Sequence, residues 1–242
     1  PVVAPGVDQE KAAWKAVQHG ESALAVVDET GRFVGFIPPD RLLAVLLHEH
    51  DEDMARLGGF LRNSTMARTA SEERISKRFW HRLPWLLVGL AGAVLAADIV
   101  GFFENQLQAN VMIAFFIPGI VYLADAVGTQ TEALVIRGLS VGVPIGSVLR
   151  REIVTGVFVG LALALVFFPI GLWRWGAGGL VAAVSLSIFA ACAIANVVAL
   201  ALPWLLNRFD IDPAFGSGPL ATVVQDLLSI VIYLAIAAAI VR

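Results

Sequence analysis

The stretch Ile153–Leu172 reads IVTGVFVGLALALVFFPIGL, twenty residues without a charged side chain. A helix needs about 20 mainly apolar residues to cross the hydrocarbon core of a bilayer. Hydrophobic segments of this kind follow one another from Pro84 to Val241. The whole chain is 58% hydrophobic and 15% charged, with a mean hydropathy of +0.78. Because about a quarter of a soluble domain is usually charged, the sequence predicts a mostly α-helical integral membrane protein.

Five transmembrane helices are predicted, with bounds at Pro84–Phe103, Val111–Gly128 with a continuation to Gly138, Leu149–Leu172, Gly179–Leu206 and Leu220–Val241. They form a predicted transmembrane domain over residues 84–242. Residues 1–66 are predicted to form a small α/β segment with a connecting helix, and residues 67–83 a linker and interfacial helix.

The basic residues predict the orientation of the chain. With the N-terminus in the cytoplasm, the basic residues on the inside are Lys77, Arg78, Arg82, Arg137, Arg150, Arg151 and Arg208. Only Arg174 and Arg242 then lie outside, which satisfies the positive-inside rule. We therefore expect a multi-pass protein of the inner or plasma membrane with its C-terminus outside. A net charge of −3 with no basic face argues against a nucleic-acid partner.

Carboxylates inside the predicted spans are the first functional signal. Asp98, Asp125, Glu132 and Asp226 fall where a bare charge is expensive, and such residues mark ion or water pathways. In the second span, Pro118 cannot donate a backbone hydrogen bond, so we expect a kinked or interrupted helix with freed carbonyl groups.

The polar residues of the second and fifth spans follow helical spacing. Asp125, Thr129 and Glu132 are four and three residues apart and share one helix face. In the fifth span, one polar stripe contains Thr222, Gln225, Asp226, Ser229 and Tyr233. No lysine or arginine lies within that span, so a cation is the simplest partner for Asp226.

The ligand types predict a hard cation. All four histidines precede the first span, and Cys192 and Met112 are the sulfur-containing residues of the spans. We expect Cys192 to pack as an apolar residue. Carboxylate, hydroxyl and carbonyl oxygens suit Mg²⁺ or Ca²⁺, and a hydrated Mg²⁺ ion can be recognised through its water shell.

Two segments resemble the second and fifth transmembrane helices of the MgtE family of magnesium channels. They are Ala114–Gly142, AFFIPGIVYLADAVGTQTEALVIRGLSVG, and Asp212–Tyr233, DPAFGSGPLATVVQDLLSIVIY. The resemblance implies a homodimer that conducts Mg²⁺ through a pore on its two-fold axis, lined by these helices. It also implies that Asp226 is the selectivity carboxylate, completed by backbone carbonyls near Gly218–Thr222 and Ala124–Gly128.

The chain departs from the family pattern in the second span. Family members carry a glycine-rich GGN segment where this sequence has Asp125, Ala126 and Val127. A second acidic ring at Asp125 is therefore expected. The predicted metal-site residues are Asp226, Asp125, Thr222, Gly218, Gly128, Thr129 and Glu132, with Glu104 and Asp98 as candidates for an outer vestibule. For Glu132, a side chain that reaches toward water at the helix end is the alternative.

The N-terminal part resembles the second half of a CBS repeat. Ala23–Ile37 predicts two strands around the turn Asp28–Gly31, and Asp40 is a predicted N-cap of a helix over Arg41–Leu47. The resemblance implies that the magnesium-sensing gate of the family is reduced or missing. A nearby acidic cluster is either a divalent-cation site or a solvated helix start, and it consists of Asp51, Glu52 and Asp53.

A proton-coupled secondary transporter or exchanger of Co²⁺, Mn²⁺ or Ca²⁺ is the alternative to a channel, because membrane acids suit it too. Such transporters commonly show two related halves, and no repeat relates the first spans to the last. A membrane enzyme fits worst, because the spans contain no histidine and no evident base beside Ser185, Ser187 or Cys192.

Overall fold

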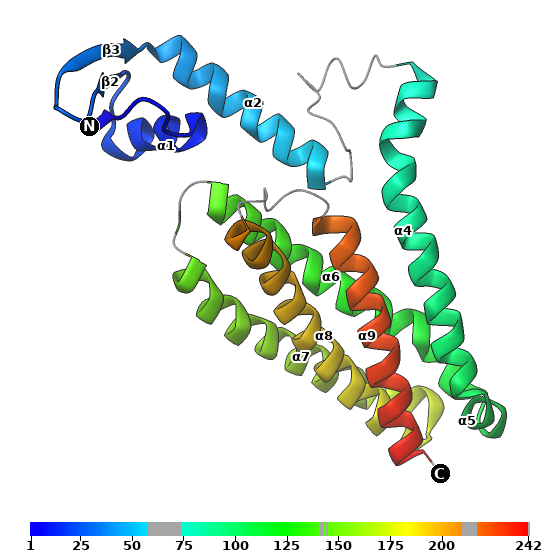
Figure 1. Cartoon of the computed structure of the whole chain (residues 1–242). Coiled ribbons are helices and arrows are strands. Elements are labelled where there is room, and N and C mark those ends of the chain that lie inside the picture. Colours follow the sequence, from blue (N-terminus) through cyan, green and yellow to red (C-terminus); the bar gives the residue numbers. More distant parts are fainter. Residues whose placement is uncertain (58–73, 141–142, 144, 210–216, 242) are drawn as a thin grey trace.

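The computed structural model describes residues 1–57, 74–140, 143, 145–209 and 217–241. It consists of a small α/β segment at the N-terminus and a bundle of long helices (Figure 1). The predictions that concern residues 58–73 and 210–216, including the first part of the linker at 67–73, lie outside the described residues.

The bundle contains five helices that are long and apolar enough to cross a membrane, as predicted. They are α4 (Ile75–Phe102), α6 (Met112–Ser140), α7 (Ile145–Trp175), α8 (Gly178–Arg208) and α9 (Ser217–Ile240). The short helix α5 (Glu104–Ala109) connects α4 to α6. We call the end of the bundle that faces the N-terminal segment the proximal end, and the opposite end the distal end (Figure 1).

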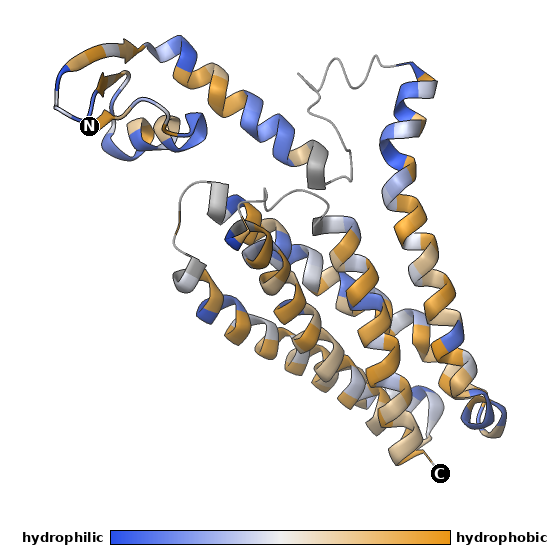
Figure 2. Ribbon diagram, in the orientation of Figure 1, coloured by the Kyte–Doolittle hydropathy of each residue, from blue (hydrophilic) through white to orange (hydrophobic). Residues whose placement is uncertain are grey.

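Helix α4 is longer than the predicted first span. It begins at Ile75 and continues through Pro84 without a break, so residues 75–83 are its first turns. At 1.5 Å per residue its 28 residues extend over about 42 Å, more than the ~30 Å of a bilayer core. Figure 2 shows hydrophilic residues on these first turns. They therefore extend past the proximal boundary of the apolar part.

Helix α8 forms the centre of the bundle, where it packs against α6, α7 and α9. Small residues permit close contacts between the helices, both with α8 and between α4 and α9. A Cβ atom on Gly160 of α7 would lie 3.0 Å from the backbone oxygen of Phe189, and one on Gly92 of α4 would lie 2.6 Å from a methyl group of Val223. Close packing of the glycine-rich spans is thus a property of the single chain.

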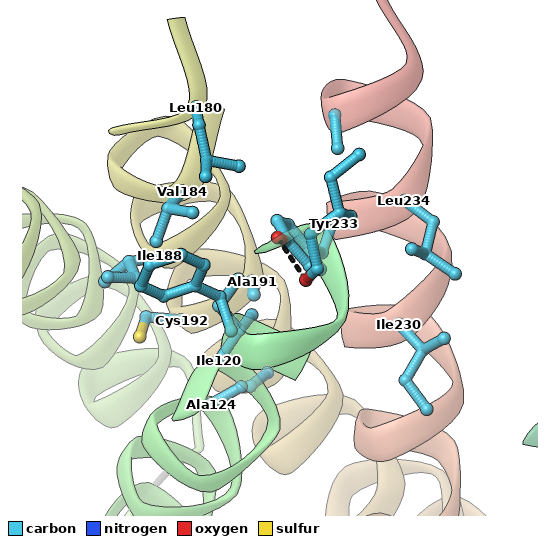
Figure 3. Packing of buried hydrophobic residues seen from close by; sticks show 14 of the residues in the cluster. Ile120, Ala124, Leu180, Val184, Ile188, Ala191, Cys192, Ile230, Tyr233 and Leu234 are labelled. Atoms are coloured by element: carbon cyan, nitrogen blue, oxygen red, sulfur yellow. Dashed lines mark hydrogen bonds between the residues drawn. The ribbon is translucent and has the colours of Figure 1, made fainter. Parts of the chain in front are cut away.

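The hydrophobic core lies between α6, α8 and α9 (Figure 3). Ile120, Ile188 and Leu234 are almost fully buried there, and Cys192 is buried among apolar neighbours as predicted. The hydroxyl of Tyr233, also fully buried, donates a hydrogen bond of 2.7 Å to the backbone oxygen of Ile113. This bond joins α9 to the start of α6.

The second span is not interrupted, so this part of the prediction is wrong, whereas a kink at Pro118 stays a prediction. Helix α6 is continuous from Met112 to Ser140 with Pro118 inside it. Proline removes one backbone donor, but transmembrane helices tolerate it where neighbouring helices and side chains support the backbone. Residues on both sides of Pro118, including Phe116 and Ile120, pack into the core and hold the helix in place.

The N-terminal segment contains β1 (Val2–Val3), α1 (Gln9–His19), β2 (Leu24–Val27), β3 (Phe33–Ile37) and α2 (Pro39–Leu57). The sheet order is β1-β2-β3, with β1 parallel and β3 antiparallel to β2. The predicted hairpin is confirmed. Asp28 accepts hydrogen bonds from Thr30 and Arg32, and Gly31 adopts a φ of 78° in the turn.

Asp40 does not cap α2, which is a correction to the prediction. The helix begins at Pro39, two residues before the predicted start at Arg41, and Asp40 lies in its first turn. Proline is favoured at the first helical position because its missing N–H would have no partner there anyway. The negative charge of Asp40 still interacts favourably with the helix dipole.

We predict that Tyr233→Phe lowers the free energy of unfolding by about 1 kcal/mol, because it removes a buried hydrogen bond between α9 and α6. The measurement is thermal unfolding of the purified protein in detergent. Tyr122→Phe is the matched control, because Tyr122 is 71% exposed. Equal stability of the two variants would show that the Tyr233 hydroxyl does not stabilise the bundle.

Candidate functional site

Two carboxylates come together where α6 packs against α9. Asp125 and Asp226 are both half-buried, and the charge of Asp125 interacts unfavourably with that of Asp226. Oδ1 of Asp125 is buried and has no hydrogen-bond partner within the described part of the chain. The sequence placed these acids on two helices, and the fold brings them close enough to repel. A cation between them would remove that repulsion.

A close contact between the two helices lies beside these acids. Gln225, which precedes Asp226, is 2% exposed and packs against Gly128 of α6. A Cβ atom at position 128 would lie 2.0 Å from Oε1 of Gln225, so only glycine leaves room for this amide. Gly128 was predicted as a carbonyl ligand; the structure also gives it a packing role that its sequence motif did not reveal.

Four other predicted residues line one cavity of about 450 Å³ at the proximal end, between α4, α6 and α9. They are Thr129, Glu132, Gly218 and Thr222. The third wall comes from α4, through Trp85, Leu86 and Gly89, which sequence reasoning did not assign to the site. The seven predicted metal-site residues therefore divide into this cavity and the Asp125–Asp226 region with Gly128.

Glu132 is oriented by a polar junction of three helices. The preceding residue, Thr131, donates a hydrogen bond to Oδ1 of Asn196 on α8, and Nδ2 of Asn196 donates one of 2.7 Å to the backbone oxygen of Glu152 on α7. Gly156 makes room for Asn196, because a Cβ atom there would lie 2.4 Å from its Cγ. Asn196 thus bonds across helices and fixes the rotation of α6. Glu132 itself is 4% exposed. The alternative interpretation, in which its side chain reaches toward water at the helix end, is therefore wrong.

The MgtE family model, described as a divalent cation transporter, matches residues 117–236. This range contains α8, nearly all of α6 and α9, both acids and all four predicted cavity residues. The membrane part of this chain belongs to the MgtE family. The assignment confirms the resemblance that the sequence showed.

Curated relatives with the same family name match nearly the whole chain. The magnesium transporter MgtE of Bacillus subtilis is 30% identical over 236 residues, which cover 96% of this chain and 51% of that protein. The protein of the same name from Thermus thermophilus is 31% identical, with 95% of this chain and 51% of that protein covered. The chain therefore spans about half the length of the curated relatives that it matches.

The two acids predicted for an outer vestibule do not line the same cavity. Glu104 is exposed on α5, accepts a hydrogen bond of 2.8 Å from Gln108, and lines a distal cavity of about 330 Å³. Asp98 is exposed on α4 and does not line that cavity. The vestibule stays a prediction for Glu104, and the structure gives Asp98 no part in this cavity.

The acidic cluster of α2 does not converge on one point. Successive residues of a helix point about 100° apart, so Asp51, Glu52 and Asp53 face different directions. Glu52 is 8% exposed and lies 3.8 Å from His48 one turn earlier, whereas Asp53 faces α1. Within the described ranges, no group of three or more histidine, cysteine or acidic side chains could hold a metal ion.

An acidic pocket lies where the N-terminal segment meets the bundle. It has a volume of about 330 Å³, and Glu10, Glu49, Asp53 and Arg137 are among its lining residues. Arg137 comes from the proximal end of α6, and α2 also contacts α9. Burial and the nearby charges of Asp53 and Glu49 raise the pKa of Glu10 to about 7. The pocket therefore joins the N-terminal segment to α6, and the separate contact between α2 and α9 joins it to the second acid-bearing helix.

We predict that the packing of α1 on α2 weakens as the pH rises. A raised pKa in the folded state means that the stabilising contribution of protonated Glu10 is complete below the ordinary pKa of 4.5 and is lost as the pH rises through about 7. Hydrogen exchange of α1 amides, corrected for intrinsic rates, should show less protection at about pH 8 than at about pH 6. In Glu10→Gln the protection should stay high at both pH values; equal pH dependence of both proteins would contradict the account.

Proposed function

We propose that this chain carries hydrated divalent cations, Mg²⁺ above all, through a channel lined by α6 and α9. The observation that carries the proposal is the pair of acids on these helices. Asp125 and Asp226 repel each other, and Asp125 has a buried oxygen without a hydrogen-bond partner among the described residues. Acceptor groups that lack donors inside a membrane segment suit a mobile cation better than any fixed structural role.

The chemistry of the site favours Mg²⁺. Thr129, Glu132 and Thr222 line the proximal cavity, and each side chain offers oxygen as a ligand. Hard cations prefer such ligands, and Mg²⁺ keeps most of its waters when few carboxylates are available. The cavity of about 450 Å³ has room for an ion with its water shell. The named function of the relatives, magnesium transport, supports the same ion.

We further propose that two copies of the chain form the channel as a homodimer. One chain supplies two carboxylates to the α6–α9 region, and an isologous dimer would place a second, identical pair opposite them across a two-fold axis. Asp226 then forms the selectivity site and Asp125 a second acidic ring. Helix α4 supports this assembly, because it packs mainly on α9 and leaves most of its surface uncovered in the single chain.

The proposed orientation places the proximal end in the cytoplasm of the cell. That end of the bundle carries Arg82, Arg137, Arg150 and Arg208, whereas the distal end carries Arg174. Positively charged residues concentrate on the cytoplasmic side of membrane proteins. The N-terminal segment then lies in the cytoplasm, the C-terminus outside, and the proximal cavity at the inner mouth of the pathway.

One observation favours proton-coupled transport as a second candidate. Glu132 is 4% exposed and lies in the wall of the proximal cavity, where a carboxyl group could exchange protons during transport. A coupled mechanism requires the lumen pH to change in proportion to metal movement. A pH dye inside the same liposomes distinguishes it from a channel.

We predict that Asp226→Asn lowers Mg²⁺ flux into liposomes at least about tenfold, because the amide keeps the size of the side chain and removes its charge. The full chain is reconstituted with an internal Mg²⁺ indicator. Asp98→Asn, which removes a membrane carboxylate from the exposed surface of α4, should retain most of the flux. Unchanged flux in Asp226→Asn would remove this residue from the pathway.

The same assay tests the second acidic ring. Asp125→Gly restores the residue type that the family pattern has at this position, and it should change the flux of Mg²⁺ relative to Mn²⁺, Co²⁺ and Ca²⁺. The reason is that a removed carboxylate weakens the binding of each ion according to how readily the ion loses water. An unaltered profile would make Asp125 a structural residue.

A further inference from the structure

Gln225 is a buried amide that packs against Gly128, but this contact does not provide a hydrogen-bond donor for its oxygen. Its side chain is 2% exposed, and Oε1 has no hydrogen-bond partner within the described part of the chain. Ser229, one turn further along α9, differs in this respect, because its hydroxyl donates to the backbone oxygen of Gln225 at 2.7 Å. Burying an acceptor without a donor costs free energy, so such a group requires a functional or solvent-related explanation.

The position of Gln225 connects it to both acids. It is the residue before Asp226, and it packs against Gly128, which is one turn of α6 from Asp125. The absence of a side chain at Gly128 is what admits the amide, since a Cβ atom there would lie 2.6 Å even from Nε2. The amide therefore lies along the same α6–α9 contact as the two carboxylates.

The polar groups along this contact include oxygen atoms that accept hydrogen bonds but have no donor beside them in the described residues. Oε1 of Gln225 and Oδ1 of Asp125 are both buried without hydrogen-bond partners in the described residues. Asp226 and Asp125 repel each other. A divalent cation that keeps its water shell supplies what is missing, because its bound waters are strong hydrogen-bond donors and its charge offsets both carboxylates.

We propose that the side-chain amide of Gln225 is a specificity-determining ligand for the water shell of the transported cation. This inference rests on the proposed function of α6 and α9 as the cation pathway. A neutral oxygen recognises a bound water without added negative charge, so it favours a hydrated ion without holding it too tightly to leave. Gln225 thereby selects for ions that retain their waters, Mg²⁺ before Mn²⁺.

The test uses substitutions that keep the length of the side chain. Gln225→Met retains the volume and removes the amide, so the contact with Gly128 is preserved. In liposomes, it should raise the half-saturating Mg²⁺ concentration about three- to tenfold, as expected for one lost hydrogen bond, and reduce the preference for Mg²⁺ over Mn²⁺. Gln225→Glu keeps an oxygen at this place and should restore a half-saturating concentration at or below that of the unaltered protein.

Ser229→Ala is the matched control, since it removes a buried polar group of α9 that is already satisfied within its own helix; its flux and ion preference should stay unchanged. If Gln225→Met behaves like the unaltered protein, or Gln225→Glu is as weak as Gln225→Met, the inference is overturned. If Gln225→Met does not fold, Gln225→Asn, which withdraws the oxygen by one methylene, takes its place with the same expected result.

A second measurement separates this inference from the proposed function. If the unaltered protein and Asp226→Asn carry equal Mg²⁺ flux, the proposed function fails. The increase in melting temperature that Mg²⁺ produces in the purified protein then tests Gln225 by binding alone. A smaller increase for Gln225→Met supports the ligand role, and an equal increase contradicts it.

Discussion

The repulsion between Asp125 and Asp226 is the constraint on which the rest of this structure depends. A single carboxylate at the centre of a membrane helix costs about 2.5–3.5 kcal/mol on insertion scales, and two that face each other cost more. The fold places both acids where α6 meets α9. Arg137, in the last turn of α6, is the basic residue of these two helices. A cation in this region, or a proton on one of the two acids, would remove the repulsion.

The surrounding helices hold the acids in place. Helix α8 packs against α6 and α9 together, so both acid-bearing helices rest on one support. At one end of α6, Ile113 accepts the hydrogen bond of Tyr233, and at the other end Thr131 is bonded to Asn196. A site that must bind and release an ion needs its ligands positioned by packed helices, because a loosely held ligand loses selectivity.

The sequence predicted the features that depend on composition and on local spacing. These features are the five spans, which follow from hydropathy, the hairpin around Asp28, which follows from turn chemistry, and the burial of Cys192 as an apolar side chain. The continuity of α6 through Pro118 did not follow, because neighbouring helices compensate for a lost backbone bond. The wall that Trp85 contributes to the cavity also depends on which helices pack together, and spacing along one helix cannot reveal that.

The role of Gly128 shows the same limit at the site itself. A glycine beside a polar face predicts an accessible backbone. In the structure, Gln225 of α9 occupies the space that a side chain at position 128 would need. The strand β1 and the helix α1 were missed because the chain before Ala23 has only short apolar runs. Tertiary contacts thus decide the details of the site, whereas the sequence decides its chemistry.

The central claim is that acids from two copies of the chain hold a hydrated divalent ion within the membrane. Anomalous scattering from crystals soaked with Mn²⁺ in place of Mg²⁺ tests it most directly. The account predicts an ion on a two-fold axis between the Asp226 carboxylates of both copies, with water between metal and protein. A monomer, or a dimer in which Asp226 faces lipid or packed protein far from any ion, would contradict it.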